Sequence, residues 1–267
     1  MKKTILLILF IILNTSLYAQ EEVNRLLDSL KIIPTTISFH PEGDILISTS
    51  WSREKPQYLM VITKPEGKIN IDTLSSQRPN RSVFFKDGAY LVHNYRDEVS
   101  GKFYTAKRKY NSPDDIGAPV LISEALFVDN MYYYFMDDNQ GFYYYTYVRE
   151  NRPEGGLLYS KFENGRYQKP QMIHPDRKNA VAYSPLLLND KTMIFAQHGV
   201  KDDTNQGIHF SIKNDEGQWS APEVLEEIPM SNVITYYNEN EISFLVAKTA
   251  RLKLYQKKYI MEMIKEK

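Results

Sequence analysis

The residues best suited to bind a ligand are five arginines and one histidine in polar segments between apolar strands. They are Arg53, Arg81, Arg96, Arg149, Arg177 and His198. A guanidinium group binds a planar oxyanion through two parallel hydrogen bonds. If the fold gathers these side chains, they predict a site for an anionic or sugar-like ligand, or for the carboxylates of a protein partner.

Acidic neighbours offer a second interpretation of the same residues. Glu54, Asp97, Glu150 and Asp202 lie beside the basic positions. Exposed pairs of this kind contribute little to stability, and long loops are polar because water solvates them. The choice between a binding site and solvated ion pairs depends on how the strands place these loops.

Other kinds of site find less support in the sequence. Asp137-Asp138 and Asp202-Asp203 lack the alternating oxygen ligands and the bidentate glutamate of a calcium loop, so turn capping is their expected role. The histidines lack zinc-binding spacings, and the chain has no cysteine and no G-x-S-x-G motif. We therefore expect no metal, no cofactor and no catalytic residue.

A repeated motif indicates how the chain is built. The segment "NDEGQWSAPEVL" (214–225) contains G-x-aromatic-x-x-P, and "ENGRYQKPQMI" (163–173) repeats it, with looser copies at 65–74 and 114–122. Upstream turns recur at separations of 45, 53, 50 and 48 residues, at Gly43, Gly88, Gly141, Lys191 and Glu239. Units of this length with almost no helical periodicity predict an all-β fold, a β-propeller of five four-stranded antiparallel blades. Six blades are the alternative, if 123–140 forms a partial extra sheet.

The best-preserved unit resembles a known repeat. Residues 184–225 are similar to the WD40-like (PD40) repeat in the propeller of TolB and of many exported Bacteroidota proteins. Those blades begin with Ser-Pro, turn at Asp-Gly-Lys, continue in an "LxF" strand and end in "DGxWxxP". Residues 142–173 fit less well and the other units weakly, and Asn189-Asp190-Lys191 replaces Asp-Gly-Lys. The resemblance implies a binding or scaffolding module.

The propeller fold would place the basic residues together. In propellers, the loops joining second to third strands and the loops joining blades lie on one face around the central channel, so the six residues would share a rim. A glycosidase-like enzyme is the alternative function, but it needs paired acids at the channel. The expected first strands contain one acidic residue, Asp129. A structural subunit of an envelope complex is a third interpretation.

The first residues are typical of a secretory signal peptide. Lys2 and Lys3 precede an apolar run from Ile5 to Leu13, and Ala19 offers a small residue for cleavage. The run is too short to span a bilayer. We expect a signal peptide over 1–19 and one propeller domain over 20–267, periplasmic or secreted, without a membrane span. Loss of the two lysines changes the net charge from zero to about −2, which argues against nucleic acid as a partner.

The ends of the chain should close the ring. The last unit contains three strands, the third expected over 251–263, and lacks a fourth. We predict that residues 22–30 supply it as an outer strand. The alternative is a helix, because Val23, Leu26, Leu27 and Leu30 have helical spacing.

Aromatic residues are expected mainly in the core. We expect Trp219 to pack on the hairpin between third and fourth strands, covering its own blade and the gap to the next. The tyrosine-rich segment 131–148 alternates on both faces of a hairpin. Both faces of an inner propeller strand are buried, so packing is the expected role and sugar stacking the alternative.

Overall fold

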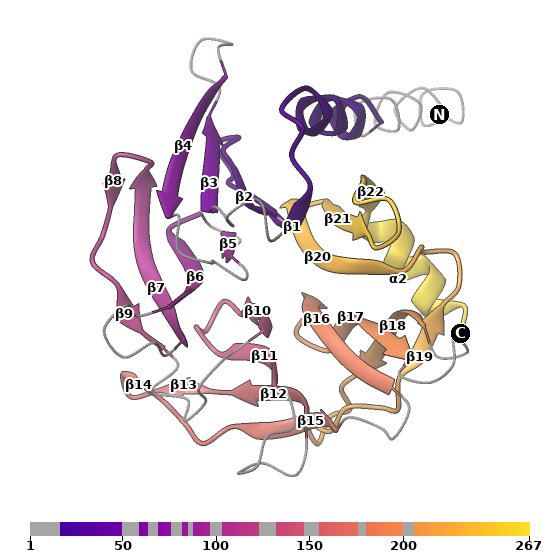
Figure 1. Ribbon diagram of the computed structural model, residues 1–267. Coiled ribbons are helices and arrows are strands. Elements are labelled where there is room, and N and C mark those ends of the chain that lie inside the picture. Colours follow the sequence, from indigo (N-terminus) through magenta and orange to yellow (C-terminus); the bar gives the residue numbers. More distant parts are fainter. Residues whose placement is uncertain are drawn as a thin grey trace, which may run out of the picture.

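The structure is a computed structural model that describes residues 17–49, 59–63, 69–75, 82–84, 88–96, 103–122, 132–146, 155–175, 180–199 and 206–267. Its sheets stand around a central axis as the five blades of a β-propeller (Figure 1). The predicted fold is confirmed with five blades. Residues 132–140 belong to the first strand and turn of the third blade rather than to an extra sheet.

The first two blades are antiparallel sheets in chain order. The first blade contains β1 (Pro34–Phe39), β2 (Ile45–Thr49), β3 (Leu59–Thr63) and β4 (Asn70–Ser75). The second contains β5 (Ser82–Phe84), β6 (Tyr90–Arg96), β7 (Phe103–Ser112) and β9 (Val120–Leu121), with β8 (Asp115–Ile116) on the end of β7.

The remaining blades follow the same order. The third contains β10 (Tyr132–Met136), β11 (Phe142–Thr146), β12 (Gly156–Ser160) and β15 (Gln171–Pro175), with the hairpin β13 (Phe162–Glu163) and β14 (Arg166–Tyr167). The fourth contains β16 (Ala180–Asn189), β17 (Thr192–Gly199), β18 (Gly207–Ile212) and β19 (Glu223–Leu225). The fifth contains β20 (Ser231–Asn238), β21 (Glu241–Val246) and β22 (Leu252–Gln256).

Apolar packing between blades holds the ring together. Neighbouring blades share buried clusters, because each blade presents two apolar faces. Representative members, pair by pair from the first blade, are Leu46 with Leu91, Val92 with Phe142, Tyr143 with Phe195, Phe210 with Phe244, and Val233 with Ile37. The last pair joins the fifth blade to the first, where the Thr235 hydroxyl donates to the Ile37 carbonyl oxygen (3.3 Å).

The tyrosines of the third blade confirm the expected core packing. Tyr143, Tyr144 and Tyr145 are consecutive in β11, so they point to alternate faces, yet each is at most 2% exposed. Tyr144 belongs to the cluster shared with the second blade, and the other two belong to the cluster shared with the fourth. Both faces of this strand therefore lie between blades.

The repeated G-x-aromatic-x-x-P motif adopts one local structure at both sites. The hydroxyl of Ser160 donates to the carbonyl oxygen of Gln168 (2.5 Å), and Ser211 donates in the same way to Ser220 (2.7 Å). Between the serine and its acceptor the chain forms a tight hairpin, in which Gly217 has a φ of +82° that favours glycine. The sequence repeat thus encodes a hairpin closed by a serine hydroxyl.

Trp219 packs on this hairpin, as predicted, but against the preceding blade. Its ring meets Tyr143 of β11 edge-on, with centroids 6.5 Å apart. The Lys213 ammonium lies over the indole, 4.7 Å from its centroid. We expected Trp219 to contact the fifth blade, and it contacts the third blade instead.

The predicted closing strand over 22–30 is wrong, because residues 17–29 are helical (Figure 1). Val23, Leu26 and Leu27 are at most 5% exposed and join the cluster between the fifth and first blades. Helical spacing puts these three side chains on one face, whereas a strand would divide them between two. The helical spacing of these apolar residues, which favoured the alternative of a helix, therefore decides the structure of this segment.

This N-terminal helix caps the edge of the three-stranded blade with side-chain amides. Asn24 accepts the backbone N–H of Leu252 (2.9 Å) and donates to its carbonyl oxygen (3.0 Å). Gln20 accepts the N–H of Leu254 (3.0 Å). These hydrogen bonds replace those that a fourth strand would make. An unpaired strand edge could otherwise pair with a strand of another chain.

The expected last strand over 251–263 ends early. The strand β22 stops at Gln256, and α2 (Lys257–Lys265) follows, burying Ile260, Met263 and Ile264 in the largest core cluster. Their helical spacing explains the change. Among the helices that the structure describes, none is long and apolar enough to cross a membrane.

Candidate functional site

Most of the predicted rim residues lie outside the described residues. These are Arg53, Arg81, Arg149 and Arg177. Arg96 ends β6 opposite Phe103, with only its backbone described. His198 is exposed near the end of β17, next to the loop after the second strand. The arginine-rich rim therefore stays a prediction.

A cavity of about 270 Å³ lies at the end of the central channel that is opposite His198 and the predicted rim. Its walls come from the first strands of four blades and from the turns that follow two of them. The lining residues are Phe39 and Pro41, 134–136, 185–186, and 234–239. We call this end the turn end. His198 lies at the opposite end of β17, because that strand begins at the turn 190–191.

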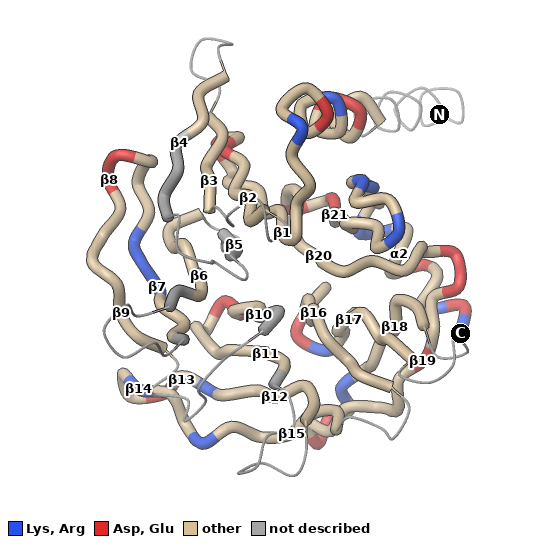
Figure 2. The backbone as a smooth tube through the Cα atoms, viewed as in Figure 1, with Lys and Arg blue, Asp and Glu red and all other residues tan. Residues whose placement is uncertain are grey.

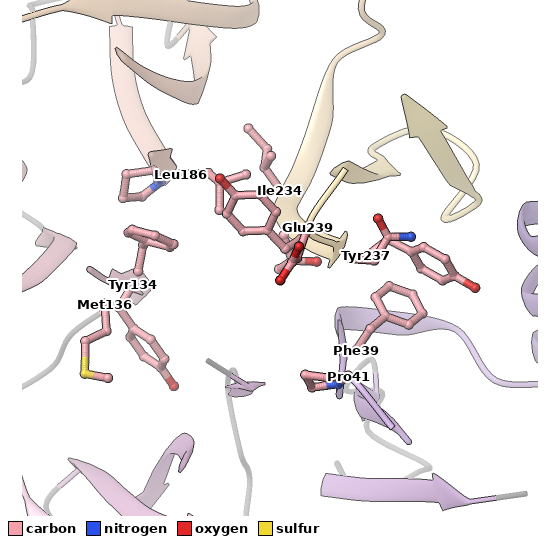
Figure 3. Close-up of a pocket in the computed structure, with 13 residues that line it drawn as sticks. Phe39, Pro41, Tyr134, Met136, Leu186, Ile234, Tyr237 and Glu239 are labelled. Atoms are coloured by element: carbon pink, nitrogen blue, oxygen red, sulfur yellow. The ribbon is translucent and has the colours of Figure 1, made fainter. Parts of the chain in front are cut away.

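Aromatic and apolar side chains form most of the wall (Figure 3). Phe39 and Tyr237 meet edge-on across the junction of the first and fifth blades, with centroids 4.8 Å apart. Tyr134 and Met136 come from the third blade on the other side. The cavity thus offers ring faces and edges from separate blades to whatever enters it.

A left-handed serine positions one wall. Ser184 has a φ of +54°, and the pairing of β16 with β17 shifts register beside it. Its hydroxyl accepts the backbone N–H of Ile234 in the next blade (2.9 Å). This contact ties Pro185 and Leu186 to β20, so the Ser-Pro start of the repeat fixes two walls of the cavity relative to each other.

Most polar side chains of the cavity are engaged by the protein. The hydroxyl of Tyr236 donates to the Leu187 carbonyl oxygen (2.6 Å), and Thr235 pairs with the Ser243 hydroxyl (2.7 Å). Tyr134 donates to the Val92 carbonyl oxygen (3.3 Å).

The amide of Asn238 is engaged too. It donates to Glu241 (2.6 Å) and accepts the backbone N–H of Asn240 (2.9 Å). Among the described lining side chains, the Tyr237 hydroxyl and the Glu239 carboxylate remain for a ligand. The cavity therefore has few hydrogen-bonding groups to give.

The described turns at the turn end carry more acidic than basic side chains. Glu42, Asp138, Asp190 and Glu239 occupy them, with Lys191 beside Asp190 (Figure 2). Burial raises the pKa of Tyr236, and the negative charge of Asp138 raises it further. Burial also raises the pKa of Tyr237, with added effects of Glu241 and Glu22. Both phenols therefore stay protonated near neutral pH, and the negative charge comes from carboxylates.

Asp137 caps the turn of the third blade, as the sequence suggested for the Asp137-Asp138 pair. Asp137 accepts the backbone N–H groups of Asn139 (2.9 Å) and Gly141 (2.7 Å), and it also accepts the hydroxyl of Tyr159 (3.2 Å). The residues that the structure describes contain no group of three or more potential metal-ligating side chains. Asp202 and Asp203 lie outside them.

The cavity does not present the paired acids of a glycosidase. Hydrolysis of a glycosidic bond by the usual routes uses two carboxyl groups on either side of the scissile bond. Glu239 is the one carboxylate among the described lining residues. What this arrangement can do chemically is bind a group through ring surfaces and one negative charge.

Comparisons with known proteins give similarity of fold alone. No family model matches the sequence, and no curated protein does. Among solved structures, an α-L-arabinofuranosidase from Podospora anserina is 14% identical over 80% of this chain and 82% of its own, with a TM-score of 0.46. The Hadza microbial sialidase Hz136 is 9% identical over 85% and 66%, with a TM-score of 0.46.

TolB from Acinetobacter baumannii is also similar in structure. It is 10% identical over 82% of this chain and 53% of its own, with a TM-score of 0.44. This chain thus spans about half the length of TolB. These structures share the fold and nothing more is taken from them, so the function has to be argued from the site.

The cavity is not predicted from the sequence, because its residues resemble ordinary core residues. Phe39, Phe135 and Tyr236 each stand near the end of a first strand, a few residues before the turn. An aromatic residue recurring at that position was the available signal. Charged loops drew attention to the other end instead.

Proposed function

We propose that this protein is an exported, non-catalytic binding module that holds a ligand in the aromatic cavity at the turn end of its channel. The supporting observation is a cavity walled by four blades, whose size suits a small molecule or one side chain of a partner. Export rests on the signal-like residues 1–19, and the TolB-like character rests on the repeat at 184–225.

Methyl NMR tests this proposal directly. Met136, Leu186 and Ile234 line the cavity from three blades. Val120 in the second blade and Ile212 in the fourth are 63% and 43% exposed outside the cavity and serve as internal controls. The methyl-labelled protein is titrated with choline, benzyl alcohol, glucose and benzoate. Binding in the cavity shifts the first three methyl signals and leaves the controls in place.

A matched pair of variants separates binding from general damage. Tyr237 lines the cavity, and Tyr259 is a 42% exposed tyrosine on α2 outside it. Tyr237→Ala should weaken the shifts caused by any bound compound, while Tyr259→Ala should leave them unchanged. If no compound moves the cavity methyls at millimolar concentration, the proposed site is wrong.

A further inference from the structure

We infer that the cavity is selective for small organic cations that carry an apolar body around or beside the charge. This inference rests on the proposed function, since it names the ligand class of the same site. It follows from what the walls offer: several aromatic rings, a few aliphatic groups and one carboxylate.

The shortage of hydrogen-bonding groups argues against a sugar. A sugar ring carries hydroxyls on most of its carbons, and each hydroxyl that enters an apolar cavity loses water. The side chains of Tyr134, Thr235, Tyr236 and Asn238 are already bonded within the protein. Tyr237 and Glu239 could satisfy only a small part of a sugar's hydroxyls. A ligand with one polar centre fits this supply better.

The sign of the charge selects a cation. Glu239 is an exposed residue that lines the cavity together with the Phe39–Tyr237 pair and residues of the third blade (Figure 3). No salt bridge to Glu239 is formed by the residues that the structure describes. The lining residues include no lysine or arginine; Lys257 lies over the Tyr236 ring without lining the cavity. Within the lining itself, an anion would meet this carboxylate, whereas a cation is attracted to it.

Aromatic walls strengthen the same preference. Ring faces attract ammonium groups, most of all where water is excluded. The protein already shows this contact nearby, because the Lys257 ammonium lies over the Tyr236 ring, 5.4 Å from its centroid. Apolar substituents on the cation would then fill space against Met136, Leu186 and Ile234.

A pair of isosteric probes measures the charge preference. Choline and 3,3-dimethylbutan-1-ol have nearly the same shape, and only choline is charged. We expect choline to bind about 3- to 30-fold more tightly, the range for a cation against aromatic rings. Both affinities come from the shifts of the Met136, Leu186 and Ile234 methyls. Raising the salt concentration should weaken the binding of choline and leave the binding of the alcohol unchanged.

A charge-removing variant assigns the effect to Glu239. Glu239→Gln keeps the shape of the side chain, and we expect it to weaken choline binding several-fold with little effect on the alcohol. Glu216→Gln is the control, because Glu216 is exposed in the hairpin after β18. A thermal melt of each variant confirms that it is folded.

The ammonium of a lysine in a partner protein shares this chemistry. A Gly-Lys-Gly tripeptide blocked at both ends distinguishes that source: tighter binding than choline assigns the site to a partner's lysine, and weaker binding assigns it to a free small cation. Equal affinities for choline and the alcohol, with cavity methyls shifted, would overturn the charge preference and leave the proposed function standing. No shift with any probe would overturn both.

Discussion

The fourth and fifth blades have similar inner hairpins and different outer edges. In the fourth, β19 pairs with β18, and a serine-closed hairpin carries Trp219 onto the third blade. In the fifth, the edge of β22 meets a helix from the other end of the chain, through Asn24 and Gln20. The repeat therefore specifies the inner strands, while any element that satisfies the edge can finish a blade.

This difference matters for the cavity. Residues 234–239, from β20 and the turn after it, form a large part of the wall, and the N-terminal helix packs on the same blade. The fourth blade contributes only 185–186 and is complete within its own sequence. The wall that contributes most to the site is thus the one whose blade depends on a distant segment.

The largest expected effect comes from the buried face of the helix. Leu27 is 3% exposed in the cluster with Val233, Leu245 and Leu252. Leu27→Ala should destabilise the protein by about 3 kcal/mol, because it leaves a cavity in that cluster. Urea denaturation measures the change. Ile33→Ala, at a residue that is 63% exposed, should alter stability by less than about 0.5 kcal/mol.

Removing the amide cap should come next. Asn24→Ala leaves the N–H and the carbonyl oxygen of Leu252 without their partner, at an expected cost of about 2 kcal/mol. Amide exchange of Leu252 should accelerate, while that of His209, paired with β19 in the fourth blade, should not. Equal acceleration in both blades would mean that the helix is not a local cap.

The outer edge of the fourth blade should tolerate more. Trp219 is only partly buried, so Trp219→Ala should cost about 1–2 kcal/mol through lost contact with Tyr143 and Lys213. Exchange at Leu252 should stay unchanged, since that edge is closed by the helix. If Trp219→Ala lowered the free energy of unfolding more than Leu27→Ala does, the fourth blade's edge would matter more for stability than the helix on the fifth blade, contrary to this prediction.

The surface ion pair of the helix should matter least. Arg251 and Asp28 approach to 2.6 Å, but their side chains are 46% and 57% exposed. Asp28→Asn should therefore change the free energy of unfolding by less than about 1 kcal/mol. Denaturation at low and high salt is the check, and a larger, salt-dependent loss would show that the pair helps to dock the helix.

The sequence was sufficient for the radial fold because turns and strands repeat. Gly43, Gly141 and Lys191 mark turns that the structure places between first and second strands. The segment that closes the ring has no counterpart in the repeats, so its prediction depended on residues 22–30 alone. There the helical spacing of Val23, Leu26 and Leu27 competed with the analogy to other blades, and burial decided the outcome.

The site was harder to predict than the fold. Loops with arginine are visible in any sequence, whereas a cavity appears only when strand ends from separate blades converge. Phe39, Leu186 and Tyr237 are distant in sequence, and none of them stands out alone. Their shared place in first strands becomes meaningful only once the blades are arranged in a ring.

Contacts between a bound cation and the cavity methyls are the decisive test of cation binding at the turn end. Intermolecular nuclear Overhauser effects are measured between the methyl protons of choline and the labelled protein. Occupation of the turn end should give effects to Met136, Leu186 and Ile234 together, because they line one cavity from three blades. Effects confined to other methyls, or none at saturating choline, would contradict it.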